Sequence, residues 1–463
     1  MESLHDTFDS YRLIVTRRSA SEILLSPNGS GWVLPRVQIH PHQRIAEQLT
    51  SEVNRVWELR AYCLFVPNHQ ISGRNGKAKC AVMESVRHND KARTGTYWMS
   101  PSVAAGCSDA EEAAAISESL KDLDSYTSGE SAGPFARPGW LRELLRWTEE
   151  QVAPLGIRVT GGFRQLNASP TFSLIRLEAN GCALWFKAAG EPNSHELPIS
   201  LSLARLFPNH VPRILGVHPS WNGWLSAEAP GTALDEISDC TAWERVAEAL
   251  AELQIASMGK SAELLEGKCK DLRIPMLVEL IDPFLARMAE FMGAQEKRSP
   301  APLANSELAS LGEGLKEACS LLQSFGLPDT LGHIDFNPGN ILVSPERCIF
   351  LDWAEGCVSN PLITFEYLRE HIERRGIQES SATARLTAAH VRPWTSFYSP
   401  DDLRRALAVS PLVAVFGYAI ASDSWRSADF QRHPQLAGYL RSLTRRMYRE
   451  VLHAVERSEL CLD

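Results

Sequence analysis

The sequence has no long run of basic residues and no cluster of cysteines, and these absences exclude several classes of protein. The formal net charge of the 463 residues is −9, so a basic face that binds nucleic acid is not expected. The ten cysteines are scattered through apolar patterns and form no CxxC pair, whereas structural zinc needs clustered ligands. We therefore expect reduced, mostly buried thiols.

Long hydrophobic runs are also missing. No N-terminal stretch combines a basic region with an apolar core of about 7–15 residues, as a secretory signal would. The longest apolar stretch, residues 411–420, is interrupted by Gly417 and is too short to span a bilayer. We expect a buried helix there, no contact with a membrane and a cytoplasmic location.

One segment has the composition of a linker. Residues 126–139 are rich in Ser, Gly and Pro and show no periodicity. We therefore predict a small α/β domain at residues 1–125, a linker at 126–139 and a second domain at 140–463. No internal repeat is found, and the sequence does not indicate an oligomeric state.

In the second domain, strand patterns come before helical patterns. A helix is predicted at 140–152, followed by strands at 171–177 and 182–188 joined by Glu178-Ala179-Asn180-Gly181, which is a hairpin signal. A further helix is predicted at 197–207. From Cys240 onward, helical patterns dominate except in residues 330–352. This order predicts an α+β fold.

The strongest chemical signal lies in that exceptional segment. Asp335 and Asn340 share one tight loop that contains Pro338 and Gly339, and two short apolar strands then return the chain to Asp352. A hairpin of that size brings Asp352 close to Asn340. Mg²⁺ prefers hard oxygen ligands, which Asn340 and Asp352 can supply, and a nearby carboxylate can orient a hydroxyl and accept its proton.

The same residues resemble a known family. The spacing Asp-x-x-x-x-Asn with a later Asp resembles the catalytic loop and metal-binding Asp of kinases. His333-Ile334 before the loop, and Asp352-Trp353-Ala354-Glu355 after it, are similar to the aminoglycoside phosphotransferase family within the protein kinase-like superfamily. The resemblance implies that Asp335 is the catalytic base, that Asn340 and Asp352 bind Mg²⁺, and that His333 supports the loop.

Upstream residues extend the resemblance across about 140–463. Lys187 ends the predicted strand at 182–188, where kinases place the lysine that holds the α- and β-phosphates. Glu196, which opens the next helix, resembles the ion-pair partner of that lysine, and Glu191 is a rival for the same position. The segment 161–169 is expected to be a loop over the phosphates, although it lacks the G-x-G-x-x-G motif.

The resemblance implies a bilobal fold and an activity. A small lobe at 140–229, mainly antiparallel sheet, and a helical large lobe at 230–463 would hold ATP and Mg²⁺ between them. The γ-phosphate would pass to a hydroxyl of a small molecule, whose identity the sequence leaves open. The alternative is a catalytically weak, nucleotide-binding regulator with a kinase-like fold.

Two features depart from the family or bear on the acceptor. Related enzymes commonly support the loop with an Asp from the helix after the metal-binding Asp, and this sequence offers only Glu366 there. Acidic residues on the large-lobe helices, such as Glu366 and Glu370, would suit a cationic acceptor if they lined the pocket.

The N-terminal domain resembles a Nudix domain in outline. It has strand patterns, the segment Trp32-Val33-Leu34-Pro35 and a helical pattern at 43–57. Nudix hydrolases need a cluster of glutamates on that helix to bind Mg²⁺, and here only Glu47 and Glu52 are present. We therefore expect this domain to be inactive.

Overall fold

The computed structural model forms two compact units. The first comprises Met1–Leu197 with Arg213–Glu228, and the second comprises Pro198–Pro212 with Ala229–Asp463. The structure describes residues 8–29, 31–41, 43–67, 70–73, 76–87, 95–107, 110–128, 133–375, 381–426, 434–457 and 459–460.

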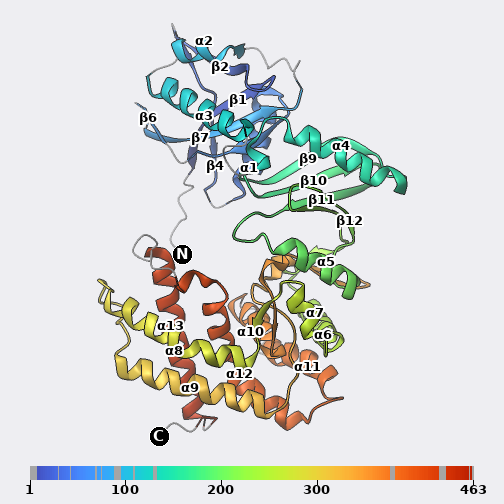
Figure 1. The fold of residues 1–463 in the computed structure, drawn as a ribbon, viewed down its shortest axis with the longest axis vertical. Helices are drawn as coiled ribbons and strands as arrows, with labels where there is room; N and C mark the ends of the chain where they lie inside the picture. Colours follow the sequence, from blue (N-terminus) through green and yellow to red (C-terminus); the bar gives the residue numbers. More distant parts are fainter. Residues whose placement is uncertain are drawn as a thin grey trace. The chain divides into compact units, whose positions relative to one another are not determined.

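The first unit contains an eight-stranded sheet in the order β3-β2-β1-β7-β5, with β4 on β1, β6 on β7 and β8 on β2 (Figure 1). Only β1 and β7 pair in parallel among these strands as described. The strands are β1 (Asp9–Arg17), β2 (Glu22–Asn28), β3 (Gly31–Val33), β4 (Arg36–Ile39), β5 (Ala61–Phe65), β6 (Gln70–Gly73), β7 (Gly76–Ser85) and β8 (Tyr97–Met99).

Helices cover both faces of this sheet. Because side chains alternate along a strand, Leu13 and Val15 of β1 pack with α1 (Ile45–Trp57), and Ile14 packs in the cluster that contains α3 (Ala110–Ser128). The remaining helix of this part is α2 (Pro101–Cys107). The helix predicted at 43–57 is thus confirmed as α1.

A second sheet in the same unit has five strands in the order β12-β13-β11-β10-β9, all antiparallel. The hairpin predicted around 179–182 is confirmed, because Ala179 of β10 pairs with Cys182 of β11 across Asn180 and Gly181. The elements are α4 (Trp140–Val152), β9 (Val159–Ala168), β10 (Ser173–Ala179), β11 (Cys182–Ala188), β12 (Ile214–Val217) and β13 (Gly223–Ala227). Helix α5 (Glu196–Leu206), which follows β11 in the sequence, begins in this unit and belongs for most of its length to the second unit.

Two expectations change at the junction of these sheets. The expectation of a loop at 161–169 is wrong for most of these residues, because β9 continues to Ala168. The turn before β10 consists of residues 169–172. Within the predicted linker, α3 continues to Ser128, and Phe135 is only 2% exposed in a cluster with residues of β5 and α4. Both flanking segments therefore share one hydrophobic core, and the division into domains at 126–139 stays a prediction.

The second unit is mainly helical. One core cluster joins α8 (Ile274–Gly293), α9 (Asn305–Ser324), α12 (Pro400–Ile420) and α13 (Pro434–Glu456). Another joins α6 (Cys240–Ala256), α7 (Ser261–Glu266), α10 (Pro361–Arg375) and α11 (Ala382–Trp394). The second unit also contains two three-stranded sheets, β14-β17-β18 and β15-β19-β16. Their strands are β14 (Thr232–Ala233), β15 (Lys270–Leu272), β16 (Thr330–His333), β17 (Ile341–Val343), β18 (Cys348–Phe350) and β19 (Gly356–Ser359). The predicted α+β class, an antiparallel-sheet part and a helical part, is confirmed.

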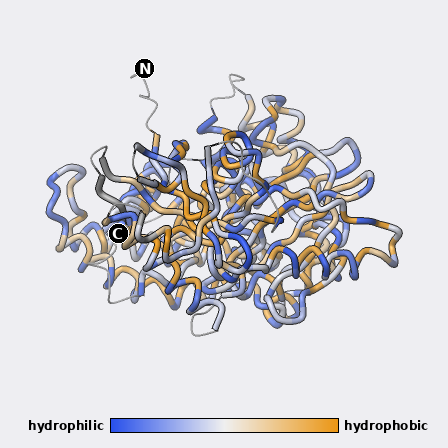
Figure 2. Tube along the Cα trace, turned by 90° about the horizontal axis from the view of Figure 1, so that it is seen from above, coloured by the Kyte–Doolittle hydropathy of each residue, from blue (hydrophilic) through white to orange (hydrophobic). Residues whose placement is uncertain are grey.

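The longest apolar stretch of the sequence, residues 411–420, forms the second half of helix α12. Among the described residues it is the one helix whose length and composition would suit a membrane span, yet 67% of its most apolar window is buried. Its residues Val409, Leu412, Val413 and Phe416 belong to the core of the second unit. In Figure 2, hydrophobic and hydrophilic stretches alternate along the tube, as expected for helices with one buried face.

Candidate active site

The loop that carries Asp335 and Asn340 is built by local hydrogen bonds. It runs from β16 (Thr330–His333) through the short helix Pro338–Asn340 into β17 (Ile341–Val343). The Asn337 side chain accepts from the Gly339 N–H at 3.1 Å, and the Asn337 carbonyl accepts from the Asn340 N–H at 2.8 Å. These contacts fix the tight turn that the Pro-Gly sequence predicts.

The hairpin that follows brings Asp352 to this loop. β17 pairs with β18 (Cys348–Phe350) in antiparallel register, and the Leu351 N–H donates to the Asn340 carbonyl at 2.8 Å. Asp352 is therefore the residue next to the one that bonds Asn340. The hydrogen bond between Leu351 and Asn340 thus brings the backbones of the two predicted metal ligands, Asn340 and Asp352, close together.

Asp352 has an unusual backbone. Its φ of 61° and ψ of 59° lie in the left-handed region, which residues other than glycine seldom adopt. The neighbours Phe350 and Trp353 are buried, and the Trp353 Nε1–H donates to the Phe350 carbonyl at 3.0 Å. Such strain costs about 1–3 kcal/mol and is typical of functional sites, where the surrounding structure holds it in place.

His333 links the loop to the strand before Asp352. Its Nδ1 accepts from the Asp335 N–H at 3.1 Å, and its Nε2 lies 3.3 Å from the Leu351 carbonyl. Since Nδ1 accepts, the ring proton belongs on Nε2, where it donates to Leu351. Burial lowers the pKa of His333, although Asp335 and Asp352 partly offset that effect, so the ring is neutral.

Two residues of this site have no signal in the motif. Thr364 of α10 accepts from the His333 N–H at 2.8 Å, and the Tyr367 hydroxyl donates to Asp335 Oδ1 at 2.9 Å. Because they are three residues apart, they share one face of the helix, but the sequence alone does not indicate that this face meets the loop. The loop is thus held by Thr364, and Glu366 bonds elsewhere.

We expect Thr364→Val to destabilise the protein. The change leaves the buried His333 N–H without a partner, which costs about 1–3 kcal/mol. The matched control is Thr387→Val, whose hydroxyl bonds the Thr383 carbonyl within α11. Thermal unfolding should show a fall of several degrees for Thr364→Val and little change for the control. Equal melting temperatures for the two variants would contradict this assignment.

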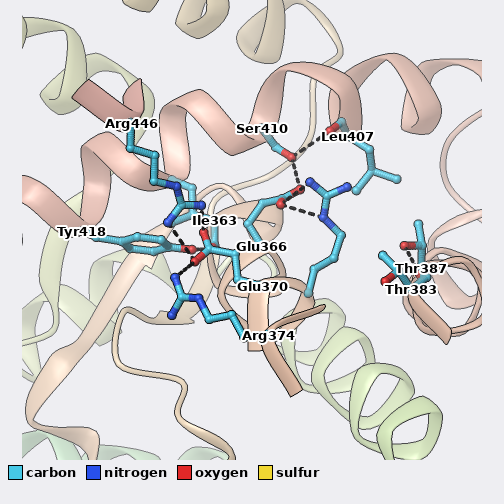
Figure 3. A network of polar contacts seen from close by, with 11 residues as sticks. Ile363, Glu366, Glu370, Arg374, Thr383, Thr387, Leu407, Ser410, Tyr418 and Arg446 are labelled. Carbon is cyan, nitrogen blue, oxygen red and sulfur yellow. Dashed lines mark hydrogen bonds and ion pairs between the residues drawn. The ribbon is translucent and has the colours of Figure 1, made fainter. Parts of the chain in front are cut away.

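Two of the acidic residues of α10, Glu366 and Glu370, are paired with arginines (Figure 3). Glu366 is 1% exposed, accepts from the Ser410 hydroxyl at 2.6 Å and pairs with Arg369 at 2.7 Å. Glu370 lies between Arg446 and Arg374, and its oxygen is 2.7 Å from the Arg374 guanidinium. These carboxylates do not form the uncompensated acidic lining that a cationic acceptor would favour.

The raised pKa of Glu366 predicts that the stability of the protein depends on pH. Burial raises its pKa from 4.5 to about 7, although Arg369 and Ser410 offset part of the effect. Between these values the folded state binds the proton that the unfolded state releases, so the unfolding free energy falls as pH rises from 4.5 to 7. The slope is at most about 1.4 kcal/mol per pH unit.

Glu366→Gln should remove this dependence. We expect the unfolding free energy of the wild type to fall relative to that of the variant as the pH rises from about 5 to about 7. This is the range between the ordinary pKa of a glutamate and the raised pKa of Glu366. Urea unfolding at several pH values measures it. Parallel curves for the two proteins would show that Glu366 does not titrate in this window.

Lys187 and Glu196 form an ion pair in the first unit. The Lys187 Nζ is 2.5 Å from Glu196 Oε1, and the two side chains are 15% and 2% exposed. Glu191 instead accepts from the Ser194 hydroxyl at 2.6 Å. The structure therefore selects Glu196 over Glu191 as the partner of Lys187.

The N-terminal helix shows no metal site. Glu47 pairs with Arg164, and Glu52 pairs with Arg55 at 2.6 Å. Across the described part of the chain, no three His, Cys, Asp or Glu side chains are placed to share a metal ion. The resemblance of this region to a Nudix domain stays a prediction.

The cysteines give no sign of metal or redox chemistry in the described residues. The eight cysteines placed there form no disulfide, and Cys182 is exposed while the others are buried. Burial raises the pKa of the Cys63 and Cys357 thiols to about 12, which keeps them protonated. Cys107 and Cys461 lie outside the residues whose side chains are described.

Comparison with known proteins gives structures and no sequence relatives. No family model and no curated protein matches this chain. A macrolide 2′-phosphotransferase from Brachybacterium faecium is 15% identical with a TM-score of 0.46, and the match covers 65% of this chain and 98% of that one. A choline kinase from Cryptosporidium parvum is 12% identical with a TM-score of 0.46, covering 70% and 94%.

A third similar structure is a spectinomycin phosphotransferase in complex with ADP and spectinomycin. It is 11% identical with a TM-score of 0.41, and the match covers 68% of this chain and 98% of that one. Likeness of this size says nothing of the activity or the substrate of this chain.

Proposed function

We propose that this protein is an ATP- and Mg²⁺-dependent phosphotransferase that transfers the γ-phosphate to a hydroxyl of a small molecule. The main support for the proposal is the geometry of the loop that carries Asp335 and Asn340 and of the hairpin that leads to Asp352. Asp335 is held by Tyr367 and His333, and the Asn340–Leu351 hydrogen bond sets Asp352 beside Asn340. The similar structures named above fall into the same broad class of small-molecule phosphotransferases and kinases.

Each residue has a chemical role in this proposal. The Asp335 carboxylate orients the acceptor hydroxyl and takes its proton as the oxygen attacks phosphorus. The Tyr367 hydroxyl donates to one oxygen of Asp335, which fixes the direction of the carboxylate. Because His333 is neutral and its Nδ1 accepts from the Asp335 N–H, it holds the loop and takes no proton.

The donor set of the second unit fits Mg²⁺. Asp352 supplies a carboxylate and Asn340 an amide oxygen, and Mg²⁺ takes its other ligands from phosphates and water. When bound, the ion would neutralise charge that develops on the transferred phosphoryl group. In the first unit, the Lys187 ammonium, oriented by Glu196, would bind the α- and β-phosphates.

The charge around Tyr367 bears on the acceptor. Tyr367 lies next to His371 on α10, with ring centroids 5.0 Å apart, and the same helix carries Glu370 with its two arginine partners. Burial lowers the pKa of His371, so this ring is neutral as well. We infer that a neutral hydroxyl compound is accepted at least as well as a polycationic amino sugar.

The test is an acceptor-dependent release of ADP. The wild-type protein is incubated with Mg-ATP and a panel of hydroxyl compounds that pairs each amino sugar or amino alcohol with a neutral analogue of similar size. The proposal predicts ADP release that depends on at least one acceptor. Binding of nucleotide without turnover for any acceptor would favour the nucleotide-binding regulator instead.

A further inference from the structure

Strand β9 lies at the edge of its sheet. There it is contacted by residues 9–136, which we call the N-terminal segment. β9 is the last strand of the five-stranded sheet, and β5 is the last strand of the eight-stranded sheet in the same unit. Edge strands present backbone N–H and C=O groups that have no partner within the sheet. The contacts between β5 and β9 show how these two edges are joined.

Gln165 of β9 joins the two edges through its side chain. Its Oε1 accepts from the Cys63 N–H at 2.7 Å, and its Nε2 donates to the Cys63 carbonyl at 2.8 Å. Gln165 is 1% exposed, so these hydrogen bonds are shielded from water. The amide of one side chain therefore takes the position that a peptide group of a neighbouring strand would take.

A bulge adjoins this contact. Gln165 pairs with Ile175 of β10, and the register then shifts before Asn167 pairs with Leu174. A bulge of this kind bends a strand and redirects its side chains. The irregularity in β9 thus falls at the position whose side chain leaves its own sheet to bond β5.

Further contacts hold β9 along its length. Arg60 donates to the Gly161 carbonyl at 2.6 Å and lies 5.6 Å from the ring centre of Phe163. Glu47 of α1 pairs with Arg164, and Ala168 packs against the core that contains α1. The N-terminal segment therefore contacts β9 from its start to its end.

The turn after β9 is held as well. The Phe135 N–H donates to the Pro170 carbonyl at 3.1 Å. Gly133 has a φ of +121°, and a Cβ there would lie 2.2 Å from the Pro170 oxygen, so only glycine fits. The turn at residues 169–172 is thus fixed by the segment between α3 and α4.

We propose that the N-terminal segment, residues 9–136, sets the position of β9 and of the turn 169–172, and that Gln165 is the positioning residue at the centre of this contact. The affinity for nucleotide then depends on the N-terminal segment. This inference rests on the proposed function, and it takes the turn 169–172 as the segment that covers the phosphates of the nucleotide, in place of the loop that the resemblance implied at 161–169.

The test compares Gln165→Met with Arg164→Ala in the full-length protein. Methionine keeps the volume of the side chain and removes both hydrogen bonds to Cys63. Arg164→Ala removes the ion pair with Glu47 on the same strand; because the Arg164 side chain is 61% exposed, this pair is expected to contribute little to holding β9. We expect Gln165→Met to speed amide exchange in residues 161–172 of the nucleotide-free protein and to raise the KM for ATP, each by about tenfold. The kcat and the KM for the acceptor should change by less than about twofold, because Gln165 is a positioning residue.

The outcomes separate this inference from the proposed function. Unchanged exchange, or faster exchange with an unchanged KM for ATP, would overturn the inference. If Gln165→Met fails to fold, Arg60→Ala replaces it, since that variant removes the bond to Gly161 from a partly buried N-terminal residue, and the same two readouts apply. A wild-type protein that binds no nucleotide would contradict the proposed function, whereas normal turnover with Gln165→Met indistinguishable from Arg164→Ala would contradict only the inference.

Discussion

Asp335→Asn should reduce kcat by about 10²–10⁴-fold, the usual contribution of a general base. Asparagine can still accept the hydrogen bond from Tyr367, so the loop should keep its shape. The amide cannot take the proton of the acceptor hydroxyl. We therefore expect the affinity for Mg-ATP to stay within about twofold of the wild type, because Asp335 is not assigned to the metal or the phosphates.

The control for this variant is Asp282→Asn. That carboxylate lies on the surface of α8 and pairs with Lys316 at 3.0 Å, so its loss should leave kcat unchanged. Steady-state kinetics and nucleotide titration measure both effects. Full turnover by Asp335→Asn would show that the base is another residue, and a parallel loss of nucleotide binding would show that the loop itself had changed.

Asp352→Asn should weaken the binding of Mg-nucleotide by more than about 10–100-fold, the loss usually seen when only an outer partner of a metal ligand is removed. Asparagine tolerates the left-handed backbone that Asp352 adopts, so the variant should fold. In the presence of a chelator, nucleotide should bind the variant at least as well as the wild type, because a negative charge near the phosphates has been removed.

This pair of titrations distinguishes a metal ligand from a residue that only supports the fold. Asp423→Asn is the matched control, since that carboxylate is 88% exposed and pairs with Arg426 outside the loop. Equal weakening with and without Mg²⁺ would contradict the assignment of Asp352 to the metal. Calorimetry with ADP provides the measurement without turnover.

The core of the site could be predicted from sequence because its geometry is local. Asp335, Asn340 and Asp352 lie within 18 residues, and the Pro-Gly turn and the two short apolar strands determine how they meet. The hairpin at 179–182 was predictable for the same reason, since Asn180-Gly181 permits the tight connection.

Thr364 and Tyr367 could not be predicted, since their contacts depend on how α10 packs against the loop. The sequence offers only Glu366 where related enzymes have a supporting Asp, and that side chain bonds Ser410 and Arg369 instead of the loop. Neighbouring positions on a helix are separated by a rotation of about 100°. Tertiary packing therefore decides which of residues 364, 366 and 367 contacts the loop.

Two segments of the first unit were harder to predict for a related reason. Gly161-Gly162 and the polar residues after them have the composition of a loop, yet they form strand β9, which pairs with β10 and is contacted by Arg60 and Cys63. Likewise, Phe135 lies in a stretch with the composition of a linker but is buried beside Trp140, with ring centroids 5.2 Å apart. Contacts between distant segments override local preference in both places.

The central claim is the transfer of a phosphoryl group to a small alcohol, and labelled ATP tests it most directly. The wild-type protein is incubated with ATP labelled at the γ-phosphate, Mg²⁺ and the panel of acceptors, and the products are separated. The label should appear in an acid-stable phosphate ester of one of the acceptors, and its rate of appearance should fall by about 10²–10⁴-fold when Asp335→Asn is used. Label that remains in ATP for every acceptor, or that appears only as inorganic phosphate or on the protein itself, would contradict this account.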